Sequence, residues 1–206
     1  MNSSLNLLKK TKYYNIGKLL AYINITIEII YIKYCLNDAS VGIFNAAYIL
    51  ILGTLMLSDA YSKLFTKNYF YLSKKNTLLL KKNFFNGNFF LIFSSIIITI
   101  IIATLSDQII YFIYGPKYIY SSKILLYLSI LIPLRYLVTN SIMLLRVYNY
   151  GYFETMSLSI VVIFKIIFVY IFINYLGLMG AVLGIVLGEL IFLICNFIFI
   201  LKSKIL

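Results

Sequence analysis

The chain has 206 residues, of which 63% are hydrophobic and only 12% are charged, and its mean hydropathy is +0.97. Soluble domains are about half apolar and a quarter charged, so this composition excludes an ordinary soluble domain and indicates a polytopic membrane protein. The net charge of +12 would suggest nucleic acid in a soluble protein. Here the lysines lie between apolar runs, so membrane orientation explains them better, and we expect no nucleic-acid partner.

Catalytic chemistry has little support in the sequence. There is no histidine, which removes the usual general base, proton shuttle and metal ligand. The two cysteines, Cys35 and Cys195, have neither metal-ligand spacing nor a disulfide framework around them. The sequence also has no nucleophile elbow and no glycine-rich phosphate loop. We therefore expect a protein that is not an enzyme and that has no cofactor and no metal site.

Six apolar runs predict an all-α protein with six transmembrane helices in one domain, 1–206. The first run is the least apolar, so we expect it to face other helices or water rather than lipid. Gly115 and Pro116 are expected to end the third run, and residues 174–177 predict a tight turn before the sixth. The predicted spans are about 14–35, 40–60, 84–114, 124–145, 155–175 and 178–201.

The longest predicted connection is 61–83, which interleaves lysines with leucine, phenylalanine and tyrosine. This pattern fits helix ends plus an amphipathic segment on an anionic cytoplasmic leaflet. Simple positive-inside topology is a sufficient explanation as well. The six lysines are Lys63, Lys67, Lys74, Lys75, Lys81 and Lys82.

The distribution of basic residues predicts the orientation. With both termini in the cytoplasm, 13 lysines and arginines lie inside and three lie outside, which is the bias expected of cytoplasmic loops. The remaining two, Arg135 and Lys165, lie within predicted spans. The inside set is Lys9, Lys10, Lys12, Lys18, the six lysines of 61–83, Arg146, Lys202 and Lys204, and the outside set is Lys33, Lys117 and Lys123.

Arg135 lies near the middle of the fourth span. A guanidinium keeps its proton, and at the centre of a bilayer it costs at least ~2.5 kcal/mol, so it requires a buried partner, a wet cavity or an anionic ligand. Pro133, two residues earlier, removes a backbone donor and is expected to kink the helix.

Four ionisable residues lie near span centres: Glu28, Arg135, Lys165 and Glu189. One interpretation is internal ion pairing that holds the bundle together. The other is that Arg135 and Lys165 face a shared hydrated cavity and bind an anionic substrate group, while Glu189 and Glu28 balance their charge or take up a proton. Asp59 and Asp107 lie nearer the interfaces and are interpreted as solvated helix ends.

The sixth span carries a ladder of glycines at four-residue steps, namely Gly180, Gly184 and Gly188. Small residues at this spacing let helix backbones approach closely, so the ladder predicts helix packing. It also places Glu189 beside a tightly packed face.

Three stretches, in this order and separation, resemble the C-terminal half of polysaccharide (O-antigen) flippases of the multidrug/oligosaccharidyl-lipid/polysaccharide exporter superfamily. The resemblance covers roughly residues 15–200. The stretches are 41–48 (VGIFNAAY) with a span that ends in Ser62-Lys63-Leu64, 113–118 (IYGPKY) running into 124–134 (ILLYLSILIPL), and 174–184 (NYLGLMGAVLG).

The resemblance implies one six-helix lobe of a MATE-like bundle in the bacterial cytoplasmic membrane. Such proteins move an undecaprenyl-diphosphate-linked oligosaccharide to the outer leaflet for surface-polysaccharide biosynthesis, without bond chemistry and without an ATP site. Their two lobes rock around a central cationic cavity, where Arg135 and Lys165 would lie. The implied partners are the lipid-linked oligosaccharide, the membrane and a second six-helix lobe, either a separate chain or a second copy.

Three alternatives remain open at this point. A multidrug or cation exchanger of the same superfamily is one, although central cations suit an anionic ligand better. A membrane-embedded polysaccharide polymerase or ligase is another, although the long external loop with arginine or histidine expected of such enzymes is missing from this sequence. The third is a non-functional truncated fragment of a transporter.

Overall fold

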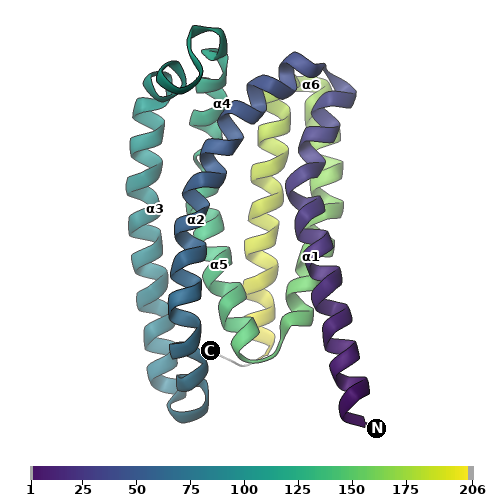
Figure 1. The fold of residues 1–206 in the computed structure, drawn as a ribbon, viewed down its shortest axis with the longest axis vertical. Helices are drawn as coiled ribbons and strands as arrows, with labels where there is room; N and C mark the ends of the chain where they lie inside the picture. Colours follow the sequence, from purple (N-terminus) through teal and green to yellow (C-terminus); the bar gives the residue numbers. More distant parts are fainter. Residues whose placement is uncertain (1, 204–206) are drawn as a thin grey trace.

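The computed structural model describes residues 2–203, with side chains from Asn15 onward, and this part of the chain is a bundle of helices without strands (Figure 1). The all-α prediction is therefore confirmed. The helices are α1 (Asn2–Cys35), α2 (Asp38–Lys75), α3 (Thr77–Tyr114), the short 3₁₀ helix η1 (Pro116–Tyr118), α4 (Tyr120–Leu128), α5 (Leu131–Val147) and α6 (Gly151–Lys202).

Five helical stretches among residues 15–202 are long and apolar enough to cross a membrane. The start of α1, the α2–α3 junction, the α5–α6 turn and the end of α6 lie at one end of the bundle (Figure 1). The α1–α2 junction and the α3–α4 connection lie at the opposite end. The stretches are Asn15–Cys35, Asp38–Lys75, Thr77–Tyr114, Tyr120–Val147 and Gly151–Lys202.

The surface of α3 shows the inverted polarity of a membrane protein. Its outward face carries large apolar side chains, such as Phe85, Phe89 and Phe93, and Phe89 is 74% exposed. Its inward face buries the polar side chains of Asn88 and Ser95. Lipid is the solvent that suits this arrangement, because it leaves the apolar face in contact with hydrocarbon and lets the polar groups bond inside the bundle.

The prediction of a long connection at 61–83 is wrong, because α2 continues to Lys75 and α3 begins at Thr77. Asn76 alone joins them: its side chain accepts a hydrogen bond from the Leu79 amide at 2.9 Å, and its own N–H donates to the Leu72 carbonyl at 2.9 Å. Lysine is a good helix former, so the basic stretches extend both helices beyond their apolar parts. Hydropathy falls where the apolar part of each helix ends, but both α2 and α3 continue beyond that point.

The predicted break near Pro133 is confirmed, but it lies about one turn earlier. Helix α4 ends at Leu128 and α5 begins at Leu131, and between them the Ile130 amide donates to the carbonyl three residues before it, that of Tyr127, at 3.4 Å. Pro133 falls in the first turn of α5. Proline cannot donate to the carbonyl four residues before it, which is that of Ser129. That carbonyl instead accepts from the Ile132 amide at 3.1 Å and from Thr99 Oγ1 on α3 at 3.3 Å.

The predicted turn before the sixth span is also confirmed. Helix α6 has 52 residues, yet Gly177 within it has non-helical angles, φ 58° and ψ −135°. Only glycine adopts such a conformation without strain. The chain therefore folds back at Gly177, and the two halves of α6 run side by side (Figure 1).

The glycine ladder lies at the contact between the two halves of α6. A Cβ added at Gly180 would lie 1.9 Å from a backbone oxygen, and one added at Gly184 would lie 2.7 Å from a backbone nitrogen, so neither position has room for a side chain. A Cβ at Gly188 would meet Lys165 Cβ at 3.2 Å. The close neighbours of the first two positions are Phe172 and Val169.

Gly180→Ala is expected to destabilise the protein by about 3 kcal/mol or more, because the added methyl group forces two backbones apart. In a chain of this size this loss corresponds to a fall of roughly 6–12 °C in Tm. The measurement is thermal unfolding of the detergent-purified protein. Gly53→Ala is the matched control, since a Cβ at Gly53 on α2 has no neighbour within 4 Å. Equal melting of the two variants would contradict the close contact at Gly180.

Candidate functional site

All four of the predicted intramembrane charges meet in one network. Lys165 Nζ donates to Glu28 Oε1 at 2.6 Å and lies 3.2 Å from Glu189 Oε1. Arg135 Nη2 donates to the same oxygen of Glu189 at 2.5 Å. The four side chains come from α1, α5 and the two halves of α6, so the network joins elements that are far apart in the sequence. Two carboxylates and two cations make the network neutral as a whole.

The depth of the network differs from one end to the other. The side chains of Glu28, Lys165 and Glu189 have no exposed surface, whereas that of Arg135 is 20% exposed. Lys165 also donates to the backbone carbonyl of Asn24 at 3.0 Å, so all three of its ammonium protons have an acceptor nearby. A buried charge is tolerated only when it is paired and hydrogen-bonded in this way.

Several buried acceptors in and beside the network have no donor in the part of the chain that the structure describes. The second carboxylate oxygen of Glu28 and that of Glu189 are buried, and neither has a hydrogen-bond partner among the described residues. The side-chain oxygen of Asn24 is in the same condition. A buried acceptor without a partner costs roughly 1–3 kcal/mol. The site therefore has unused capacity for a proton or another small donor.

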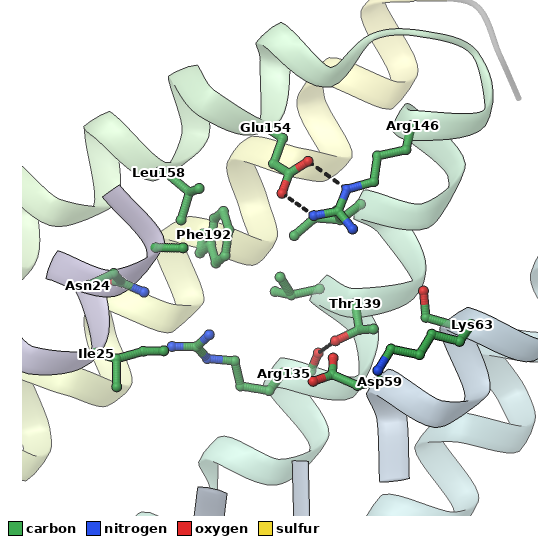
Figure 2. A pocket seen from close by; sticks show the side chains of 14 residues that line it. Asn24, Ile25, Asp59, Lys63, Arg135, Thr139, Arg146, Glu154, Leu158 and Phe192 are labelled. Atoms are coloured by element: carbon green, nitrogen blue, oxygen red, sulfur yellow. Dashed lines mark hydrogen bonds and ion pairs between the residues drawn. The ribbon is translucent and has the colours of Figure 1, made fainter. Parts of the chain in front are cut away.

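A cavity of about 380 Å³ lies between the exposed end of this network and the turn that joins α5 to α6 (Figure 2). Its walls come from α1, α2, α5 and both halves of α6. Arg135 extends along one wall (Figure 2). The lining residues are Ala21, Asn24, Ile25, Asp59, Ser62, Lys63, Arg135, Val138, Thr139, Ile142, Arg146, Glu154, Leu158 and Phe192.

A second ion pair closes the end of the cavity near the α5–α6 turn. Arg146 donates to both carboxylate oxygens of Glu154, from Nε at 2.8 Å and from Nη2 at 2.5 Å (Figure 2). Arg146 lies in the last turn of α5 and Glu154 in the first turn of α6. Each charge thus faces the helix end that it stabilises, and the two-pronged geometry fixes the turn.

The cavity receives only one of the two cations predicted to share it. Arg135 lines it, but Lys165 does not, because its ammonium is enclosed by Glu28, Glu189 and the Asn24 carbonyl. Lys165 reaches the cavity only through Glu189, which holds Arg135. Direct contact of Lys165 with a ligand therefore stays a prediction that requires a change of this arrangement.

Sequence reasoning missed the contribution of α2 to the cavity. Asp59 was expected to be a solvated helix end; it is exposed, but it lines the cavity together with Ser62 and Lys63. The spacing of these residues, i, i+3 and i+4, places them on one helix face. That spacing would have indicated a polar face if 61–83 had been interpreted as helix. Asp107, by contrast, lies near the end of α3 and does not line the cavity.

Comparison of the chain with protein-family models, with curated proteins and with solved structures found no match in any of the three. The geometry of the network and the cavity is therefore the basis for interpreting the site.

Lys165→Met is expected to cost about 3–5 kcal/mol of stability, because it leaves Glu28 as a buried charge without its cation. Adding Glu28→Gln should recover a large part of this loss, since the orphaned charge is then removed. Thermal unfolding in detergent measures both effects.

Lys33→Met is the matched control for this prediction. Lys33 pairs with Asp38 at 3.1 Å, but the two side chains are 67% and 80% exposed. An exposed ion pair contributes at most about 1 kcal/mol, so this variant should melt close to the parent protein. If Lys165→Met melted like Lys33→Met, the network would not have the energetic role assigned to it.

Proposed function

We propose that the chain is one six-helix lobe of a flippase that moves an undecaprenyl-diphosphate-linked oligosaccharide across the bacterial cytoplasmic membrane for surface-polysaccharide biosynthesis. The observation that carries this proposal is Arg135, a permanent cation at the wall of a cavity, held from behind by the buried carboxylate of Glu189. The resemblance of the sequence to this family supports the same conclusion.

Arg135 is suited to a phosphate ligand for two reasons. Its planar guanidinium offers parallel donors that match phosphate oxygens, and such charge-assisted hydrogen bonds are roughly twice as strong as those between neutral groups. Its partial exposure leaves donors available while Glu189 keeps the side chain in place. A cavity of about 380 Å³ also falls in the range of sites for small ligands, so it has room for a headgroup while the lipid chain stays in the bilayer.

The proposal includes six crossings with both termini in the cytoplasm. At 1.5 Å per residue a straight α6 would be roughly 78 Å long, far more than a bilayer core of about 30 Å, so each half of α6 is assigned one crossing. The basic residues Lys18, Arg146, Lys202 and the six lysines of α2 and α3 then belong to the cytoplasmic side. Lys9, Lys10, Lys12 and Lys204, which complete that set, lie outside the residues whose side chains are described.

A second lobe completes the proposed transporter. Alternating access requires one repeat to move against another around the substrate, and a single six-helix lobe supplies one wall of such a pathway. The partner is a separate six-helix chain or a second copy of this one. In the full assembly Glu189 and Glu28 balance the cations while the cavity is empty, and their unpaired oxygens give the pair the capacity to take up a proton.

A cation exchanger of the same superfamily is the second candidate. The unpaired carboxylate oxygens of Glu28 and Glu189 favour it, because carboxylates bind cations and protons. Neither carboxylate lines the cavity, however, and of the four charges in the network only that of Arg135 does. A cation is thus the part of the network that a ligand meets, which favours an anionic substrate.

Topology can be tested with single cysteines at Leu78 and Tyr120, in a background that carries Cys35→Ala and Cys195→Ala. Both positions are exposed, and they lie at opposite ends of the bundle. A membrane-impermeant thiol reagent on intact cells should label the chain with Tyr120→Cys and not the chain with Leu78→Cys. After the cells are broken both should react, which controls for reactivity. The reverse pattern would invert the proposed orientation.

The ligand can be tested by the binding of undecaprenyl diphosphate to the detergent-purified chain, measured by native mass spectrometry. Arg135→Gln should weaken binding by about tenfold or more, the loss expected when hydrogen bonds between charged groups disappear. Arg135→Lys should fall between, because it keeps the charge and loses the fork. Lys123→Gln, which removes an exposed cation outside the cavity, is the control. Undiminished binding by Arg135→Gln would reject the proposal.

A further inference from the structure

The cavity contains a third cation whose circumstances differ from those of Arg135 and Arg146. Lys63 lies on α2, in the part of the helix that continues beyond the predicted span. Figure 2 shows its side chain and the guanidinium of Arg135 on different sides of the cavity. A ligand that enters the cavity therefore meets positive charge from two helices, α2 and α5.

Lys63 is also the cavity cation without a carboxylate partner. Arg135 is paired with Glu189, and Arg146 is held at two points by Glu154. For Lys63 the structure records neither an ion pair nor a hydrogen bond to any residue from 15 to 203. An anion can therefore bind Lys63 without sharing it with a carboxylate, whereas at either arginine it shares the guanidinium with one.

Asp59 adds a condition to this site. It lies one helical turn before Lys63 and faces the same cavity, but the two side chains form no ion pair within 4 Å. Its negative charge opposes the approach of an anion and is partly screened by water in the cavity. The site at Lys63 therefore favours a ligand that another residue of the cavity already holds and that carries a second, separate negative group.

We propose that Lys63 binds the second phosphate of a diphosphate whose first phosphate is held by Arg135, so that the cavity distinguishes lipid diphosphates from lipid monophosphates. This inference rests on the proposed function and names the residue that gives that site its selectivity. The fork of arginine fixes the geometry of one phosphate, and the flexible four-carbon stem of lysine lets a point charge adjust to the other. A monophosphate satisfies Arg135 and leaves Lys63 in water.

The test compares two probes, undecaprenyl phosphate and undecaprenyl diphosphate, binding to the full chain in detergent and measured by native mass spectrometry. Lys63→Gln should weaken binding of the diphosphate by about five- to tenfold, the effect of one lost charge-assisted contact, and change that of the monophosphate by less than about twofold. Arg135→Gln should weaken both probes. Lys67→Gln is the matched control, because it removes an exposed lysine one turn further along α2 that does not line the cavity.

The variants separate the two proposals. If Arg135→Gln weakens both lipids while Lys63→Gln changes neither, the role of Lys63 is overturned and the proposed function stands. The role of Lys63 is also overturned if Lys63→Gln weakens the binding of both lipids equally, or if Lys67→Gln weakens binding of the diphosphate to the same extent. Either result would mean that lysines attract the lipids only through their general positive charge. If neither Arg135→Gln nor Lys63→Gln changes the binding of either lipid, the proposed function fails and this inference fails with it. Circular dichroism of each variant checks that the helices are intact.

Discussion

The burial of the Lys165 ammonium is the constraint on which the rest of the bundle depends. An ammonium in an apolar interior costs several kcal/mol unless carboxylates and carbonyls surround it. Glu28 from α1, Glu189 from the second half of α6 and the Asn24 carbonyl meet that requirement. They can do so only if α1 and the α6 hairpin are in contact. Glu189 then has one oxygen to share with Arg135, which brings α5 to the same place. The position of the cavity follows from these contacts.

The glycine ladder makes the network geometrically possible. Gly188 lies directly against the aliphatic part of Lys165, and the residue after it, Glu189, is thereby placed within reach of the ammonium. A larger residue at Gly184 or Gly180 would separate the two halves of α6 and lengthen that contact. In hydrocarbon, helices gain little from apolar contact alone, so close packing of small residues and polar bonds between helices do most of the joining. In this protein the close packing of glycines and the polar bonds between helices act at the same interface, the one between the two halves of α6.

The features that depend on composition and on single residues could be predicted from the sequence. Hydropathy predicted an all-helical membrane protein, residues 174–177 predicted the fold-back, and depth in the spans identified Glu28, Arg135, Lys165 and Glu189 as a set. Hydropathy marks the apolar core and not the ends of helices, so the continuation of α2 and α3 to Asn76 was missed, and Asp59 and Lys63 with it. The rotation of each helix about its axis depends on packing against all the others. For that reason the sequence did not indicate that Arg135 faces the cavity and Lys165 faces away.

The interruption at Ser129 and Ile130 has a mechanical consequence. It divides the stretch from Tyr120 to Val147 into two helical rods, α4 and α5, that meet at a joint, where the Ser129 carbonyl accepts a hydrogen bond from the Thr99 hydroxyl of α3. The rod α5 is roughly 25 Å long, so a tilt of about 20° at the joint carries its far end through roughly 9 Å while α4 stays in place. Arg135 is close to the pivot and moves little. Arg146 is at the tip and, through Glu154, draws the start of α6 with it. The same swing would therefore change the width of the cavity at the α5–α6 turn and leave its innermost cation almost stationary.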